Sequence, residues 1–416
     1  MEIRFLGGAG EVGRSGILLK DSKTILLDYG IKVDGHTEYP EKAGRVDACI
    51  VSHAHLDHSG FSPSLYHEGF PLTVATEPTM KLAELLIEDS MKIHRKKHEH
   101  EHFHKAQLHT MMNRYLPLPY SQTTEFDRYD ISLHNAGHIC GSAVSLIEKK
   151  ASGRRLVYTG DFKMEPQLLE KGAEVVKSNI LILESTYANK DHPDREGLIQ
   201  RMVDEIWETV DNGGTALLPA FAVGRSQELL AILQRSGLIK RTFIDGMARA
   251  ATDIVAGYPD YVSDRSLLEN AIRNSVWVDS RRKKMEAVDG GNVIVTTSGM
   301  LNGGPVLDYI TRLNRESRIF ITGFQVEGTN GNKMIQGRPI DIDGRDYRVR
   351  TPFSVYDLSA HAGKKDIHEY VKRSCPETVV CVHGSEENTS ILAQDLRAEG
   401  FDAYAPRVGD SISVEF

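Results

Sequence analysis

One segment constrains this chain more than any other part of its sequence: SHAHLDHSG at residues 52–60. It follows the apolar run Ala48–Val51, which predicts a buried strand that ends where the histidines begin. His53 and His55 are two residues apart, so an extended backbone directs both side chains the same way. Asp57 and His58 lie in the following turn and can face a second point. Imidazole and carboxylate groups are zinc ligands, and so tight a segment suits two adjacent metal ions better than one.

Three further polar residues occur at the ends of predicted strands. His138 follows Asn135-Ala136-Gly137, Asp161 follows Tyr158-Thr159-Gly160, and His383 follows the apolar run Thr378–Val382. Each alone is more simply interpreted as a turn or core residue. Together they repeat one pattern, in which an apolar strand ends in a metal-binding side chain beside a small residue. Glycine at such a place lets backbone or substrate come close.

The composition excludes several classes of protein. With 416 residues the chain is long enough for two or three domains. It has no apolar run of the roughly 18 residues that a transmembrane helix needs, and its start lacks the basic and apolar regions of a secretory signal. Its four cysteines form no paired motif, which is typical of a reducing compartment. The net charge of −8 excludes a uniformly basic nucleic-acid binder. We therefore expect a cytoplasmic protein with no membrane segment.

The pattern of the chain changes twice. The first 190 residues are rich in short strands, whereas helical periodicity alternates with short apolar strands between residues 195 and 322. This alternation predicts a mainly parallel sheet covered by helices. Residues 337–350 predict a strand pair that turns at Asp343-Gly344. From Pro352 the strand-and-histidine character returns. We therefore predict one domain from residues 1–187 and 351–416, with a second α/β domain, 188–350, inserted into it.

The combined motifs resemble those of a known family. His-x-His-x-Asp-His, the later His138 and the Thr-Gly-Asp of Asp161 resemble the metallo-β-lactamase fold. The inserted domain resembles the β-CASP branch, whose three motifs are matched by Glu184, His361 and His383. FAVGRSQE at residues 221–228 is most similar to the nuclease subunit of the cleavage and polyadenylation specificity factor, and above all to its archaeal homologues. The resemblance covers the whole chain. We do not expect the N-terminal KH domains of some archaeal relatives, because the motifs of the core begin near Met1.

The resemblance implies a fold and a set of site residues. The fold would be an αββα sandwich with a β-CASP insertion, holding two Zn²⁺ ions per chain. One zinc ion would take His53, His55 and His138. The other would take Asp57, His58 and His383, with Asp161 between them. Asp28 is expected to orient a ligand histidine or the metal-activated water. His361 is the candidate general acid, and Glu184 would hold its imidazole.

Several residues of the inserted domain are expected to meet RNA. They lie in loops after predicted strands or at a helix start, where ligands of parallel sheets bind. Phe324 could stack on a base or pack in the core, and the sequence leaves this open. The candidate RNA contacts are Arg225, Ser226, Ser298, Gln325 and Thr329.

The predicted function is zinc-dependent hydrolysis of RNA phosphodiester bonds, endonucleolytic and in RNA 3′-end processing or maturation. The alternative is a 5′→3′ exoribonuclease of the ribonuclease J type. A non-catalytic scaffold is disfavoured because every expected ligand is present, and a small-molecule hydrolase because such enzymes lack the insertion. The expected substrate is single-stranded RNA, and assembly as a homodimer or in an RNA-processing complex stays open. A histidine-rich segment, residues 94–109, could hold a metal ion, but a solvated helix is the simpler interpretation.

Overall fold

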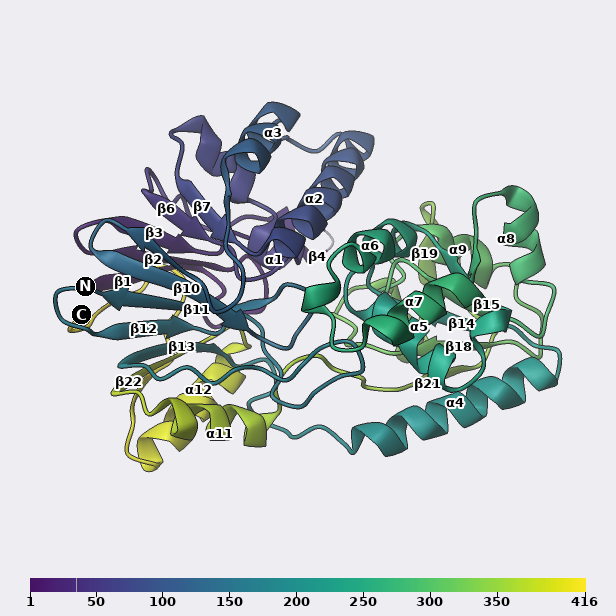
Figure 1. The fold of residues 1–416 in the computed structure, drawn as a ribbon. Helices are drawn as coiled ribbons and strands as arrows, with labels where there is room; N and C mark the ends of the chain where they lie inside the picture. The colour runs from purple at the N-terminus through teal and green to yellow at the C-terminus, as the bar shows by residue number, and fades with distance from the viewer. Residues whose placement is uncertain (35) are drawn as a thin grey trace. The chain divides into compact units, whose positions relative to one another are not determined.

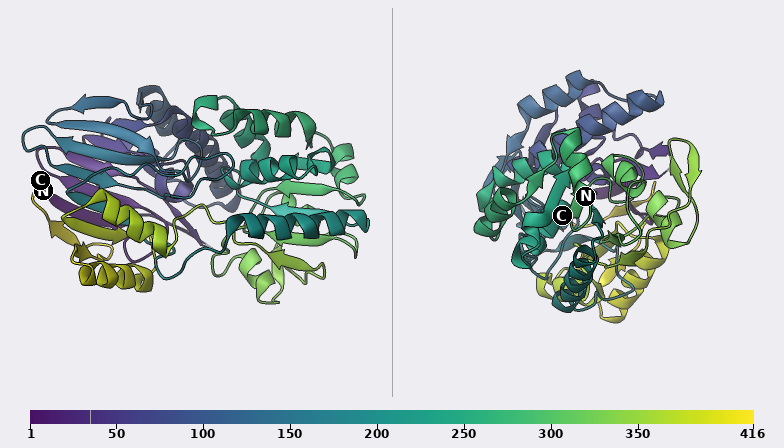
Figure 2. Two further views of the ribbon diagram at one scale, coloured as in Figure 1. Left: turned by 60° about the horizontal axis from the view of Figure 1, so that its bottom comes forward. Right: turned by 90° about the vertical axis from the view of Figure 1, so that its right-hand side faces the viewer.

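The computed structural model describes residues 1–34 and 36–416, which form two compact units (Figures 1 and 2). Unit 1 consists of Met1–Pro166, Lys171–Asp191 and Ala360–Phe416, and unit 2 of Gln167–Glu170 and His192–Ser359. The chain therefore leaves unit 1 twice and returns to it twice. The domain borders predicted after residues 187 and 350 stay a prediction, since compact units and folding domains need not divide at the same residue.

The first sheet of unit 1 has seven strands. Their bounds are β1 (Glu2–Gly7), β2 (Gly16–Lys20), β3 (Thr24–Leu27), β6 (Ala48–Ile50), β7 (Leu72–Ala75), β8 (Leu116–Pro117) and β24 (Ser411–Ser413). The spatial order is β24-β1-β2-β3-β6-β7-β8. Strands β24 to β3 pair antiparallel, and β3, β6, β7 and β8 run parallel. Because β1 pairs with β24, the two ends of the chain lie side by side (Figure 2).

The second sheet of unit 1 also has seven strands. Their bounds are β9 (Thr123–Phe126), β10 (Tyr129–Asn135), β11 (Ala143–Lys149), β12 (Arg155–Tyr158), β13 (Ile180–Glu184), β22 (Thr378–Val382) and β23 (Asp402–Tyr404). The order is β23-β22-β13-β12-β11-β10-β9. All five residues of β13 are buried, as expected for an interior parallel strand with neighbours on both edges. The first four residues of ILILE are therefore apolar on both faces of the sheet, and the one polar residue, Glu184, ends the strand.

The two sheets pack face to face and are covered by helices on their outer faces. One apolar cluster joins Phe5, Ile25 and Ile50 of the first sheet to Leu133 and Ile182 of the second. A second cluster lies between the second sheet and two C-terminal helices. Figure 1 shows helices outside both sheets. These helices are α1 (Leu56–Ser59), α2 (Glu77–Lys97), α3 (Lys105–Arg114), α11 (Lys364–Ser374) and α12 (Glu386–Ala398). The predicted αββα sandwich is thus confirmed.

Unit 2 is built on a six-stranded parallel sheet. Its strands are β14 (Ala216–Pro219), β15 (Thr242–Asp245), β16 (Val276–Trp277), β17 (Val293–Thr296), β18 (Arg318–Ile321) and β21 (Phe353–Val355). The order is β16-β15-β17-β14-β18-β21, with every pair parallel. The apolar clusters on the two faces of this sheet include Leu218 and Leu217 respectively, as the alternation of a strand requires. The parallel sheet predicted from the alternating pattern is confirmed.

Helices connect the strands of unit 2. They are α4 (Arg195–Asp211), α5 (Arg225–Arg235), α6 (Met247–Ala256), α7 (Arg265–Asn274), α8 (Arg281–Ala287), α9 (Pro305–Ile310) and α10 (Asn330–Ile335). The predicted strand pair is also present as β19 (Ile340–Ile342) and β20 (Arg345–Tyr347), which turn at Asp343 and Gly344, both with positive φ. No helix in the described part of the chain is long and apolar enough to cross a membrane.

Candidate metal centre

The ligand-bearing segments of unit 1 meet where strands of its two sheets end. The histidine motif leaves β6 and continues into α1, whereas His138 follows β10, Asp161 follows β12 and His383 follows β22. The backbone at His383 is left-handed, with φ of 47°, so the chain turns sharply as it leaves the strand. The predicted residues of both ligand sets therefore converge although they are separated by more than 300 positions in the sequence.

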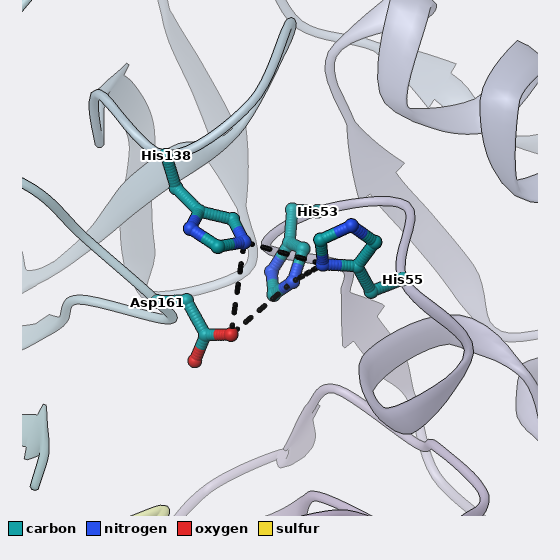
Figure 3. A group of neighbouring side chains, drawn as sticks. All are labelled: His53, His55, His138 and Asp161. Atoms are coloured by element: carbon teal, nitrogen blue, oxygen red, sulfur yellow. Dashed lines mark hydrogen bonds and ion pairs between the residues drawn. The ribbon is translucent and has the colours of Figure 1, made fainter. Parts of the chain in front are cut away.

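The first group of ligating atoms consists of three imidazole nitrogens and a carboxylate oxygen (Figure 3). Nδ1 of His55 lies 3.2 Å from Nε2 of His53 and 3.2 Å from Nε2 of His138. Oδ2 of Asp161 lies 3.5 Å from the His53 nitrogen and 3.9 Å from that of His138. Four ligands at 2.0–2.1 Å from a tetrahedral zinc ion are roughly 3.3 Å apart. The group therefore fits a metal ion without rearrangement.

The second group is Asp57, His58 and His383. The Nε2 atoms of the two histidines are 3.2 Å apart, and Oδ2 of Asp57 lies 3.3 Å from Nε2 of His383. Oδ1 of Asp161 lies 3.3 Å from Nε2 of His58. These spacings again suit one small cation.

Asp161 faces both groups with different oxygens. Oδ2 is directed at His53 and His138, whereas Oδ1 lies close to His58 and to Nδ1 of His383. Oδ1 is buried and accepts no hydrogen bond from the described residues. A buried carboxylate oxygen without a donor is costly unless a cation lies beside it. The donor set and this atom together indicate a dinuclear metal site.

The protonation states suit metal binding. Burial, followed by the charge of His58, holds the pKa of His53 well below its usual range. Burial, followed by His361, does the same to the pKa of His138. Both imidazoles are therefore neutral near neutral pH, the form that binds a metal. Burial alone would raise the pKa of Asp161, but the surrounding histidines outweigh it and lower that pKa strongly, so the carboxylate is ionised.

His58 differs from the other ligands. Burial disfavours its charged form, but three neighbouring carboxylates, led by Asp161, outweigh burial and raise the pKa of His58 well above its usual value. A cation bound between these groups takes the place of that proton, so metal binding here is coupled to proton release.

A third group contains Asp161, Glu184 and His361. Glu184 ends β13 and is 1% exposed. Its Oε1 accepts the backbone N–H of Phe162 at 2.8 Å, and Oε2 lies 2.9 Å from Nδ1 of His361. Nδ1 of His361 is 3.9 Å from Oδ2 of Asp161. The predicted pair of Glu184 and His361 thus lies directly beside the first group of ligands.

Asp28 is fully buried at the end of β3 with φ of 56°. Its Oδ1 accepts the backbone N–H of Ser52 at 2.7 Å. Its Oδ2 lies 2.7 Å from Nδ1 of His58, from Oγ of Ser52 and from the hydroxyl of Tyr158. The predicted orienting position of Asp28 is therefore matched by a direct contact to a ligand histidine. Nothing in the sequence singles out Ser52 or Tyr158, although both lie inside the motifs that contain ligands.

Most of the polar side chains predicted to meet RNA are engaged inside unit 2. Oγ of Ser226 donates to the carbonyl of Phe221 at 2.6 Å, and the Gln325 amide donates to the carbonyls of Gly299 and Gly323 at 3.1 Å. The Thr329 side chain caps α10, and that of Ser298 donates to Gly303. Their hydroxyl and amide groups therefore shape the loops at the carboxyl end of the sheet.

The two remaining candidates in unit 2 are placed differently. Arg225 is the first residue of α5. Phe324 is 64% exposed, which excludes the core role left open by the sequence. An exposed phenylalanine beside two glycine-containing loops remains a candidate for base stacking.

The histidine-rich segment is not among the candidate metal groups of the described residues. None of the groups of three or more ligating atoms found there includes a residue from 94–109. The spacing of His94, His98 and His102 suggests a shared helix face, but α2 ends at Lys97 and His98 adopts a left-handed conformation. His94 donates to the carbonyl of Ser90 at 2.7 Å, and the ring of His102 packs 4.0 Å from that of Tyr39.

Three family models match successive parts of the chain. The metallo-β-lactamase superfamily domain matches residues 17–186, the Beta-Casp domain matches residues 226–334, and the Zn-dependent metallo-hydrolase RNA specificity domain matches residues 346–406. The chain is 35% identical over 429 residues to the probable RNase MJ4 of Methanocaldococcus jannaschii, and the alignment covers 100% of both proteins. The chain belongs to the β-CASP family of metallo-β-lactamase-fold ribonucleases.

Two further relatives and one solved structure agree with this family. The chain is 34% identical to RNase aCSPSF2 of Saccharolobus solfataricus over 99% of this chain and 85% of that protein. It is 34% identical to transcription termination factor FttA of Methanocaldococcus jannaschii over 100% of this chain and 72% of that protein. A protein of unknown function from Enterococcus faecalis V583 has the same fold, with a TM-score of 0.64, 14% identity and 99% of each chain covered. The family models and the ribonucleases among these relatives identify the chain as a metal-dependent RNA hydrolase.

Proposed function

We propose that this β-CASP protein is a zinc-dependent endoribonuclease that cleaves single-stranded RNA during 3′-end formation or maturation. The observation that carries the proposal is the arrangement around Asp161, whose two oxygens serve two ligand groups while His361 lies 3.9 Å from one of them. Two ligand groups that share a carboxylate and adjoin a protonated histidine supply what phosphodiester hydrolysis needs. The printed names of the relatives, two ribonucleases and a transcription termination factor, support this cellular context.

The donor set supports zinc as the metal. Five imidazoles and two carboxylates make up the two groups: Asp57 belongs to the second group, and Asp161 is shared by both. The assigned ligands are His53, His55, Asp57, His58, His138, Asp161 and His383. Nitrogen-rich sites with tetrahedral spacing favour zinc over magnesium or calcium, which prefer oxygen ligands. Two zinc ions held there would supply an activated water at neutral pH and would offset charge on the phosphate.

His361 is proposed to give the leaving oxygen its proton. Nδ1 of His361 donates to Glu184, and we assign the transfer of the proton to the other ring nitrogen, Nε2. Glu184 is held by the Phe162 N–H and therefore presents a fixed acceptor. The chain's own residues thus orient the imidazole and keep it charged before RNA binds.

Unit 2 is proposed to hold the RNA strand. Arg225 at the start of α5 and the exposed ring of Phe324 offer a phosphate contact and a stacking surface. Because the net charge of −8 repels RNA, binding has to depend on such local contacts. The loop residues Ser226, Ser298, Gln325 and Thr329 support this surface through their backbone, in our proposal, since their side chains are engaged internally.

The direct test is cleavage of RNA labelled at either end and carrying a 5′-triphosphate or a 5′-monophosphate. We expect internal products from both labels, regardless of the 5′ group, and no products after chelation. His361→Ala protein serves as the matched control because it keeps the metal ligands. Release of single nucleotides only from 5′-monophosphate RNA would instead indicate the 5′→3′ exonuclease, and intact RNA in the presence of two bound zinc ions would contradict the proposal.

A further inference from the structure

The hydroxyl of Ser52 lies between a buried carboxylate and a ligand histidine. Ser52 is 1% exposed, and its Oγ is 2.7 Å from Oδ2 of Asp28 and 3.1 Å from Nδ1 of His53. The other histidines of the first group contact different atoms: Nδ1 of His55 faces Nε2 of His53, and Nδ1 of His138 faces the carbonyl of Ala360. Ser52 directly precedes His53 in the sequence, so the contact between them forms within one segment of the chain.

The number of protons available indicates which atom donates. The Ser52 hydroxyl has one proton, and it donates this proton to Oδ2 of Asp28 at 2.7 Å, the shorter of its two contacts. Oγ of Ser52 therefore accepts from His53, whose Nδ1 carries the hydrogen. Nε2 of His53 then keeps its lone pair, and this is the atom that faces His55 and Asp161.

The same carboxylate acts on the second ligand group. Oδ2 of Asp28 accepts Nδ1–H of His58 at 2.7 Å, which leaves Nε2 of His58 facing His383. One carboxylate oxygen therefore orients one histidine ring in each group. For His58 the contact is direct, and for His53 it passes through the Ser52 hydroxyl.

We propose that Ser52 is a positioning residue that links the first metal-ligand group to Asp28, so that one buried carboxylate orients ligands of both metal ions. The proposal rests on the metal centre of the proposed function but not on RNA as the substrate. It assigns to Ser52 a task that packing alone would not require: to accept the Nδ1 proton of His53.

The surroundings hold Ser52 in this orientation. Its backbone N–H donates to Oδ1 of Asp28 at 2.7 Å. A Cβ placed on Gly160 would come within 2.6 Å of the Ser52 Cβ and 2.7 Å of its Oγ. Gly160 also has φ of 53°, a conformation that favours glycine. The Thr-Gly-Asp motif therefore needs its glycine so that the Ser52 side chain fits between the strand exit and Asp28.

Ser52→Ala tests the proposal, with two matched controls. Tyr158→Phe removes a different donor to the same Asp28 oxygen, one that is not on the path to His53. Ser59→Ala removes another buried hydroxyl from the same segment, one that donates only to the backbone carbonyls of Ala54 and His55. Thermal unfolding of each apo variant checks that the fold is retained.

The first readout is metal binding by the full-length chain, titrated with Cd²⁺ and followed by ¹¹³Cd NMR, in which each group gives its own signal. We expect Ser52→Ala to weaken Cd²⁺ binding at the first group by about 10–100-fold, the usual effect of removing a partner of a ligand histidine. Cd²⁺ binding should change much less at the second group of this variant and at the first group of both control variants. Equal loss at both groups, or equal loss in Ser59→Ala, would overturn the proposal.

The second readout is the imidazole nitrogen spectrum of the Zn²⁺-loaded protein with ¹⁵N-labelled histidine. The wild-type signal of His53 should show a protonated Nδ1 in slow exchange with water, and Ser52→Ala should speed up that exchange. An unchanged His53 signal would show that Ser52 only fills space. These measurements involve no RNA, so a protein that binds two metal ions but leaves RNA intact would refute the ribonuclease proposal and leave this one standing.

Discussion

Oε2 of Glu184 lies 2.9 Å from Nδ1 of His361, although the two residues are 177 positions apart. Burial disfavours the charged form of this histidine. The carboxylates of Glu184 and Asp161 outweigh that effect and raise the pKa of His361 to about 9. Near neutral pH the imidazole is therefore positively charged and able to give up a proton.

The first prediction separates this histidine from the metal ligands. His361→Ala should reduce turnover by about 10²–10⁴-fold, the usual size of general-acid catalysis, and should keep two zinc ions per chain. Glu184→Gln should give a smaller loss, because it only orients and charges the imidazole. The double variant should be about as slow as His361→Ala, since residues that act as a unit are not additive. Single-turnover cleavage and elemental analysis measure both quantities, and loss of one zinc ion in His361→Ala would make His361 a ligand instead.

The second prediction concerns pH. The acid form of His361 is complete below its pKa and is lost as pH rises through about 9. Bound metal ions carry positive charge beside Asp161 and lower this pKa, so the cleavage rate at saturating RNA should fall on the alkaline side at or below pH 9. This limb should be absent from the residual activity of His361→Ala. The pH–rate profile of both proteins measures it. A profile of the same shape in both proteins would assign the alkaline limb to another group.

The third prediction concerns the metal. Chelation should abolish cleavage, and added Zn²⁺ should restore it, because seven buried or half-buried ligands meet around two points. His55→Ala should lose metal and activity together. Its control is His94→Ala, in which a histidine outside all three ligating groups is removed from the same unit. Full activity of metal-free protein would contradict the dinuclear centre.

The fourth prediction concerns RNA affinity. Arg225→Ala should weaken RNA binding by about 3–10-fold and should reduce the salt dependence of binding by about one phosphate contact. Arg235→Ala, in the last turn of the same helix, is the matched control. Phe324→Ala should weaken binding of single-stranded RNA with little change in the salt dependence, because a stacking contact carries no charge. Fluorescence anisotropy at several salt concentrations distinguishes these outcomes.

The fifth prediction concerns stability. Burial, followed by the charge of Glu228, raises the pKa of Glu170 well above its usual value. Glu228 itself is bonded to Arg195 at 2.8 Å and to the N–H groups of Leu168 and Leu169. The folded protein therefore holds a proton at Glu170 that the unfolded chain releases near pH 4.3. Glu170 therefore contributes to the free energy of unfolding at low pH, and this contribution is lost as pH rises through the pKa of Glu170 in the folded protein.

Glu170→Gln should accordingly stabilise the protein at pH 8 and have little effect near pH 4. The denaturant midpoint of the wild type and the variant at both pH values measures this. Glu196→Gln, which changes an exposed carboxylate of unit 2, should alter neither midpoint. A destabilised Glu170→Gln at pH 8 would mean that the carboxylate is ionised and paired.

The residues that converge around Asp161 could be proposed as ligands from the sequence because their residue types and local positions indicate metal binding. The two-residue spacing indicates His53 and His55. A position directly after an apolar strand indicates His138, Asp161 and His383. The partners of these residues could not be predicted in the same way. Which donor reaches Asp28 depends on where β3, β6 and β12 end in three dimensions, so Tyr158 carries no local signal of its contact.

Two other expectations show where local patterns fail. Histidines spaced by four suggest a shared helix face, but the left-handed conformation of His98 ends α2 before His102 is reached. Polar residues in glycine-rich loops suggest ligand contacts, but Ser226 and Thr329 use their hydroxyl groups to close turns and caps. The sequence also does not predict that Gln167–Glu170 belongs to unit 2. The N–H of Leu168 in this segment donates to Glu228, which is 60 positions away.

The order of strands has a consequence for how this protein is made. In the second sheet β13 lies between β12 and β22, and β22 is synthesised only after the whole of unit 2. Until then one edge of β13 has no partner strand, and an unpaired edge of a largely apolar strand is the kind that invites aggregation. His361 and His383 also leave the ribosome after unit 2. A chain that ends within unit 2 therefore lacks the proposed proton donor and one of the three ligands of the second group, so it should not cleave RNA.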